Sequence, residues 1–174
     1  MLTQMSGLVI LEEVMKHSVL LDTSFFIRLL NDEDVLHENA LSYYKYFLEN
    51  DIVLKVSTIS IAEYCVRGKL EDLPLKDIQV VPFNLNHAEK TGEFAQIIFT
   101  HNNESSEKLL PRAIIPNDSK LFSQADLDKS ITHFVTSDER SLKTLKALKT
   151  GISPKFEIIN IKIPYNQTFG ILDL

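Results

Sequence analysis

The fold is decided by the stretch VLLDTSFFI, residues 19–27. The apolar run at 18–21 has the pattern of a buried strand, and Thr23 and Ser24 can cap a helix that begins near residue 25. Asp22 therefore stands between a strand and a helix. In an open α/β sheet this position faces the crevice at the carboxyl ends of the parallel strands, where such sheets bind their ligands.

Three more segments each carry one acid at the end of an apolar run or on the helix beside it. Glu63 ends the stretch STISIAE, Asp118 ends IIPND, and Asp138 ends HFVTSD. We expect these acids to meet Asp22 in one crevice. Carboxylates are ligands for hard cations such as Mg²⁺, and the five scattered histidines and the single cysteine suggest no other metal site.

The rest of the sequence alternates between strand-like and helix-like segments. Further strands are expected at 52–56, 77–83, 133–136 and 156–161, and Pro82 predicts that the third strand ends there or lies at an edge. After the helix that begins near residue 25, a second helix is expected to contain residues 41–48 and to end near residue 50. Further helices are expected after Ser57, at 86–99, from 117 and at 141–149, with a loop at 100–112. This order predicts a three-layer α/β/α sandwich around a central, mainly parallel sheet.

The length of 174 residues is enough for one domain with a full core. We assign residues 15–174 to that domain and treat residues 1–14 as an extension, helical or disordered, or as the product of a misassigned start before Met15.

One cysteine, Cys65, excludes an internal disulfide and favours a reducing compartment. No apolar run approaches a membrane span, so we expect a cytoplasmic protein that does not insert into membranes. The net charge of −6 argues only against indiscriminate nucleic-acid binding.

In order and spacing, the four acidic segments resemble the four motifs of PIN domains, a family of metal-dependent ribonucleases that includes the VapC-like toxins of type II toxin-antitoxin modules. The resemblance runs from about residue 16 to about residue 165. It implies an endoribonuclease that uses Mg²⁺ or Mn²⁺ to hydrolyse RNA. It also implies an antitoxin partner and a homodimer as possible assemblies. The interval between Glu63 and Asp118 is longer than in compact toxins, and Lys120, Phe122 and Gln124 stand where the family favours small residues.

The resemblance gives each acid an expected role. Asp22, Glu63, Asp118 and Asp138 form the catalytic and metal-binding set, with Asp126 as a rival to Asp118 that would point away from the site. Asp22 and Asp118 are expected to contact the metal directly, Glu63 to bind it or to orient water, and Asp138 to bind it or to support another ligand. Four hydroxyl residues are expected to hydrogen-bond these carboxylates: Thr23, Ser24, Thr136 and Ser137. Because crowded carboxylates repel one another, at least one of them should have a raised pKa.

Basic and aromatic residues on two helices admit two readings each. A basic stripe contains Arg140, Lys143 and Lys146, which either contact RNA phosphates or form a solvated helix face. Tyr44 and Phe47 are expected in the core, whereas exposure of Tyr43 and Tyr46 would indicate an interface. Cys65 is expected in the core, and Asp126, Asp128 and Glu139 on a solvated face.

Two other functions compete with the ribonuclease. The first is a PIN-like domain without turnover that serves as an RNA-binding or assembly scaffold. The second is an acid-rich phosphatase or receiver domain. The sequence disfavours the second, because no second acid lies two positions after Asp22 and no adjacent acid pair lies beside the first strand.

Overall fold

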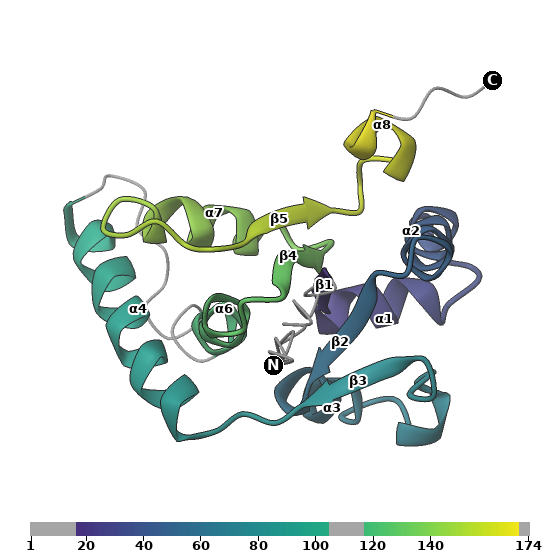
Figure 1. Ribbon diagram of the computed structural model, residues 1–174, viewed down its shortest axis with the longest axis horizontal. Coiled ribbons are helices and arrows are strands. Elements are labelled where there is room, and N and C mark those ends of the chain that lie inside the picture. Colours follow the sequence, from purple (N-terminus) through teal and green to yellow (C-terminus); the bar gives the residue numbers. More distant parts are fainter. Residues whose placement is uncertain (1–16, 105–116, 171–174) are drawn as a thin grey trace, which may run out of the picture.

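The computed structural model describes residues 17–104 and 117–170. Its centre is a sheet of five parallel strands in the order β3-β2-β1-β4-β5 (Figure 1). The strands are β1 (Ser18–Leu21), β2 (Val53–Ser57), β3 (Ile78–Val81), β4 (Ile131–Thr136) and β5 (Glu157–Asn160). The first strand lies in the middle and pairs in parallel with both β2 and β4. The predicted α/β architecture with a parallel sheet is therefore confirmed.

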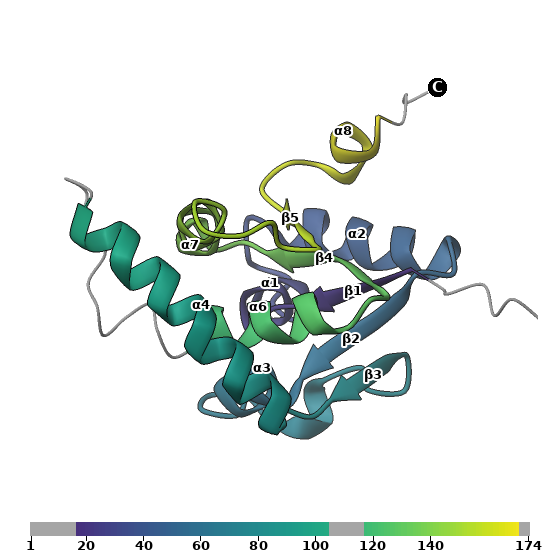
Figure 2. The same cartoon turned by 60° about the vertical axis from the view of Figure 1, so that its left-hand side comes forward.

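Helices cover both faces of the sheet, as the two views in Figures 1 and 2 show. The side chains of β1 alternate between the faces, because Val19 and Leu21 join one apolar cluster and Leu20 joins the other. The first cluster includes residues of α1 (Thr23–Leu29) and α2 (His37–Glu49). The second includes residues of α4 (Leu85–Glu104), α6 (Asp118–Leu127) and α7 (Glu139–Leu148). The three predicted layers are present.

Two short helical segments complete the described chain between β2 and β3, and one follows β5. These are α3 (Thr58–Tyr64), the 3₁₀ turn η1 (Leu70–Asp72) and α8 (Tyr165–Phe169). Strand β3 ends directly before Pro82 and lies at an edge of the sheet, as that proline predicts. The expected loop at 100–112 is wrong at its start, because α4 continues to Glu104. The rest of that loop and the extension at residues 1–14 lie outside the described residues.

The buried face of α2 differs from the predicted one. Ala40, Tyr43 and Phe47 are fully buried, whereas Tyr44, which was expected in the core, is only half-buried. Tyr43 is covered by the C-terminal segment: its hydroxyl donates to the carbonyl of Ile163 at 2.8 Å and lies 2.6 Å from the hydroxyl of Thr168. Tyr43 therefore belongs to the core rather than to a free interface, and α8 closes this side of α2.

Two acids expected on a solvated face have structural partners instead. Asp126 is buried and accepts a hydrogen bond from the backbone of Lys155 at 2.9 Å. Asp128 pairs at 2.5 Å with Lys55, a buried lysine of β2. Cys65, expected in the core, is exposed; it lies just past the end of α3, as the C-cap of that helix.

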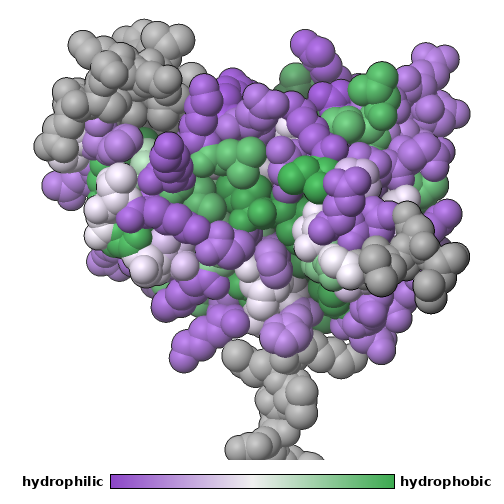
Figure 3. Space-filling model, turned by 90° about the horizontal axis from the view of Figure 1, so that it is seen from above, coloured by the Kyte–Doolittle hydropathy of each residue, from purple (hydrophilic) through white to green (hydrophobic). Residues whose placement is uncertain are grey.

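The outer surface is mixed in polarity. Seen from the side where β5 and α8 lie, apolar side chains gather near the centre of the face and polar side chains surround them (Figure 3). Ile163, just beyond edge strand β5, is exposed. Within the described ranges, no helix combines the length and the apolar character needed to cross a bilayer.

Candidate active site

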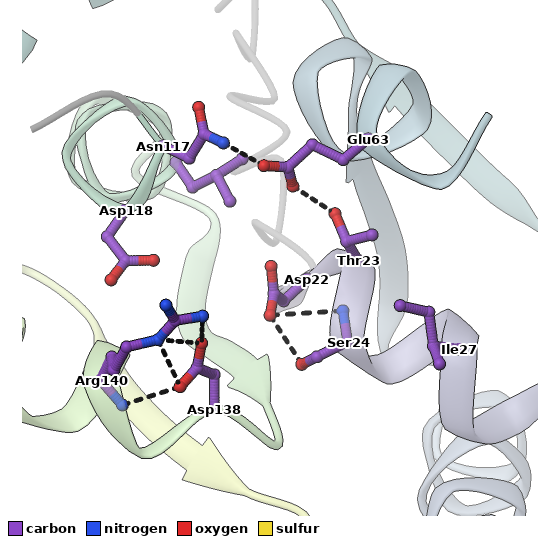
Figure 4. Close-up of a pocket in the computed structure, with 10 residues that line it drawn as sticks. Asp22, Thr23, Ser24, Ile27, Glu63, Asn117, Asp118, Asp138 and Arg140 are labelled. Carbon is purple, nitrogen blue, oxygen red and sulfur yellow. Dashed lines mark hydrogen bonds and ion pairs between the residues drawn. The ribbon is translucent and has the colours of Figure 1, made fainter. Parts of the chain in front are cut away.

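All four predicted acids line one pocket of about 370 Å³. Each comes from a different part of the fold, and Figure 4 shows them around a common space. Asp22 caps α1, Glu63 lies on α3, Asp118 begins α6 and Asp138 caps α7. Asp22 directly follows β1, and Asp138 comes two residues after the end of β4. The parallel sheet therefore brings their side chains to the same end.

Asp22 is held by hydroxyl groups on one side only. Its Oδ2 accepts hydrogen bonds from the hydroxyls of Ser24 at 2.6 Å and Thr136 at 2.8 Å. The Ser24 hydroxyl also accepts a bond from the backbone N–H of Ser137 at 2.9 Å. These contacts join the start of α1 to the end of β4. Among the described residues, none donates to the other oxygen, Oδ1, which is turned toward the pocket (Figure 4).

Glu63 is fixed by two neutral donors from separate elements. The hydroxyl of Thr23 donates to Oε2 at 2.6 Å, and the side-chain amide of Asn117 donates to Oε1. Thr23 thus contacts Glu63 across the pocket rather than its neighbour Asp22. The contact of Asn117 with Glu63 was not predicted, because the only signal for Asn117 in the sequence is its position directly before Asp118.

Asp118 has a carboxyl group whose pKa is raised to about 6. The main cause is burial, and the charges of Asp22 and Asp138 add to it. Ser141 and Thr144 donate to its two oxygens, each at 3.2 Å, and oppose this rise only in part. One carboxylate of the set therefore has a raised pKa, as predicted, but burial contributes more to it than the mutual repulsion on which the prediction rested. Ser141 and Thr144 were also missed, although both lie on the helix that Asp138 begins.

Asp138 is engaged by Arg140 through both of its oxygens. The guanidinium donates from Nη2 to Oδ2 at 2.7 Å and from Nε to Oδ2 at 2.9 Å, and the backbone N–H of Arg140 donates to Oδ1 at 2.9 Å. Although partial burial favours the neutral acid, the hydrogen bonds and charge of Arg140 lower the pKa of Asp138 below its usual value. As the pH falls, Asp118 therefore gains a proton before Asp138 does.

Asp126 and two of the three predicted basic residues lie outside the pocket. Asp126, the rival to Asp118, contacts the backbone of Lys155 and does not line the pocket. Lys143 and Lys146 are exposed on α7, and of the predicted basic residues only Arg140 reaches the lining. The structure therefore brings Asp118, and not Asp126, to the other three acids.

The donor set is suited to a hard cation, but it is not arranged as a finished metal centre. Within residues 17–104 and 117–170, no group of three or more Asp, Glu, His or Cys side chains could hold a metal ion as it stands. Glu63 and Asp138 already have donors on both oxygens, whereas Asp22 has a free oxygen and Asp118 has only two long hydroxyl contacts. The oxygen ligands and the excess negative charge fit a divalent ion at Asp22 and Asp118.

Comparison with known proteins supports the fold. No protein-family model matches the sequence, and no curated protein matches it either. Among solved structures, a chain of VapBC2 from Rickettsia felis, bound to a DNA fragment from the promoter, is similar with a TM-score of 0.53 and 19% identity, covering 82% of this chain and 98% of that one. A chain of the DNA-bound VapBC of Salmonella typhimurium has a TM-score of 0.51 and 16% identity, covering 83% and 98%. The chain therefore has the fold of a VapC-type PIN domain.

Proposed function

We propose that the protein is a metal-dependent endoribonuclease that hydrolyses RNA phosphodiester bonds. The observation that carries this proposal is the convergence of Asp22, Glu63, Asp118 and Asp138, from four separate elements, on one pocket. The raised pKa of Asp118 supports it, because burial and the charges of Asp22 and Asp138 all disfavour its carboxylate, a cost that a bound cation would offset.

The residues have distinct tasks in this proposal. Asp22 and Asp118 hold a divalent ion, Mg²⁺ or Mn²⁺, which when bound supplies charge neutralisation and an activated water for phosphodiester hydrolysis. Glu63, fixed by Thr23 and Asn117, orients the attacking water from the opposite side of the pocket. Thr136 and Ser24 hold Asp22 in place, and Ser141 and Thr144 do so for Asp118. Lys143 and Lys146 extend a basic surface along α7 for RNA phosphates.

A protein antitoxin is the proposed partner, since both similar structures are VapBC complexes. The antitoxin is not expected to bind at the aromatic side chains of α2, because Tyr43 is buried and α8 covers that side of the helix. A more suitable surface is an apolar groove of about 670 Å³ next to the acidic pocket, with which it shares Ile27 and Glu63. Exposed Leu30 and Val66 also line this groove. An amphipathic antitoxin segment bound there would cover the entrance to the acids.

The test compares wild type with Asp22→Asn in two measurements. Cleavage of a labelled pool of random-sequence RNA in Mn²⁺ should fall by about a hundredfold or more when Asp22 loses its charge. Thermal unfolding without metal should show an equal or higher midpoint for the variant, because one repelling charge is gone while the amide oxygen can still accept from Ser24. Mn²⁺ should raise the midpoint of wild type only.

Asp32→Asn is the matched control, since it makes the same change at an exposed loop position. It should retain both the cleavage and the Mn²⁺ effect. Wild-type protein that gains stability from Mn²⁺ but cleaves no RNA would favour the scaffold without turnover. Cleavage that persists in Asp22→Asn would refute the proposed site.

A further inference from the structure

The acidic pocket contains its own positive charge. Among the described residues that line it, Arg140 is the only basic one. Its guanidinium lies beside Asp138 and extends toward Asp118 (Figure 4). Arginine stays protonated at every physiological pH, so this charge is permanent. The charges of Asp138, Asp118 and Asp22 all act on it, with Asp138 contributing most.

The contacts of Arg140 distinguish Asp138, which is paired with a cation, from Asp22 and Asp118, which are not. Asp138 faces a guanidinium that uses Nε and Nη2 on its Oδ2, and its Oδ1 receives the backbone N–H. A metal ion that approached Asp138 would have to displace or closely approach this cation, which Coulomb repulsion opposes. Asp22 and Asp118, by contrast, contact only neutral hydroxyl and backbone donors.

We propose that Arg140 takes the place of a second metal ion, so that the pocket holds a single divalent cation at Asp22 and Asp118. This rests on the proposed function. In two-metal nucleases the ions lie about 4 Å apart and share the charge of the phosphate between them. Here Arg140 occupies the Asp138 side, and one cation is left for the Asp22 side.

The free part of the guanidinium gives Arg140 its task with substrate. The hydrogen bonds to Asp138 use Nε and Nη2, and no described residue accepts from Nη1. Nη1 can therefore donate to a phosphate oxygen while Asp138 keeps the guanidinium oriented. Arg140 then neutralises phosphate charge, the part that a second ion plays elsewhere.

The experiment counts the Mn²⁺ bound to RNA-free protein, from the electron paramagnetic resonance signal of free Mn²⁺ during titration. We expect about one ion per chain in wild type and about two in Arg140→Ala, because the variant frees Asp138. Arg140→Lys keeps a positive charge in the pocket and should stay near one. The Arg140 side chain is 70% exposed, so its removal should leave the fold intact, which the unfolding midpoint checks.

Lys149→Ala is the matched control, at the C-cap of the same helix. It changes the net charge equally and also breaks an exposed ion pair, that with Glu157 at 2.8 Å, but Lys149 does not line the pocket. Its count should equal that of wild type. A count of two in wild type, or of one with unchanged affinity in Arg140→Ala, would overturn the role of Arg140 and leave the ribonuclease proposal standing. No bound ion in wild type would refute the metal site itself.

Discussion

Asp118 shows at the scale of one residue how its surroundings set its charge. Its raised pKa of about 6 means that the folded chain binds a proton there more readily than the unfolded chain, whose reference value is 3.8. Between these values the native state carries more protons, so stability should fall as pH rises through this range. Above about pH 6 the charged carboxylate is a constant cost to the fold.

Asp118→Asn should therefore stabilise the metal-free protein at pH 7, by about 1 to 3 kcal/mol. The amide can still bond the hydroxyls of Ser141 and Thr144, which rotate to suit it. The advantage over wild type should disappear below about pH 4, where both chains are neutral at this position. Urea unfolding at pH 4, 5.5 and 7 measures this, and a gap that does not change with pH would contradict the assignment.

The acids themselves could be located from sequence because each follows or precedes a recognisable apolar run. The residues that hold them could not all be found in this way. Asn117 meets Glu63 only because α6 begins opposite α3, and Thr144 reaches Asp118 only because α7 packs near α6. Such pairings depend on how helices approach one another, which no local pattern encodes.

At the scale of elements, α2 and α8 depend on one another. Tyr43 of α2 places its hydroxyl between the Ile163 carbonyl and Thr168, and Tyr46 stacks on Phe169 with ring centroids 4.4 Å apart. The helical spacing of α2 was visible in the sequence, but its buried face was misread by one position. Tyr43 and Tyr44 are equally hydrophobic, so the sequence alone does not show which of them is buried. The packing of α8 against α2 buries Tyr43.

Tyr43→Phe should lower the free energy of unfolding by about 0.5 to 1.5 kcal/mol, because the carbonyl of Ile163 and the hydroxyl of Thr168 both lose the Tyr43 hydroxyl as a partner. Tyr44→Phe is the matched control, since its hydroxyl has an exposed contact of 3.3 Å with Asp77 and should matter by less than about 0.5 kcal/mol. Chemical denaturation measures both variants. Equal effects would mean that α8 does not depend on the Tyr43 hydroxyl.

At the scale of the whole molecule, the two ends of the sheet differ in how their charged side chains are paired. The acidic pocket lies at the carboxyl ends of the strands, whereas Lys55 and Asp128 pair near the other end. Lys55 lies on β2 and Asp128 precedes β4, and Ser130 contacts both, so this cluster ties together two strands that flank β1. Although partial burial opposes it, the contacts with Lys55 and Ser130 lower the pKa of Asp128, so its contribution to stability is present above about pH 4 and lost below it.

Asp128→Ala should destabilise the protein by on the order of 3 kcal/mol, because it leaves the buried ammonium of Lys55 without its counter-ion. Adding Lys55→Met should recover part of that loss, since the unpaired charge is then absent. Glu157→Ala, which breaks an exposed pair with Lys149, should cost less than about 1 kcal/mol. Thermal unfolding of these variants at pH 7 provides the comparison, and no recovery in the double variant would contradict this account.

The central position of β1 also has a consequence for timing during synthesis. Asp22 is bound by Thr136, which follows it by 114 residues in the chain. At translation rates of about 5 to 20 residues per second, roughly 6 to 20 seconds pass between the synthesis of these two partners. During that interval the nascent chain has Asp22 and Glu63 but no β4, and it lacks Asp138 and Arg140. The pocket is therefore completed only when most of the protein has been made, and the four acids cannot lie around it before that point.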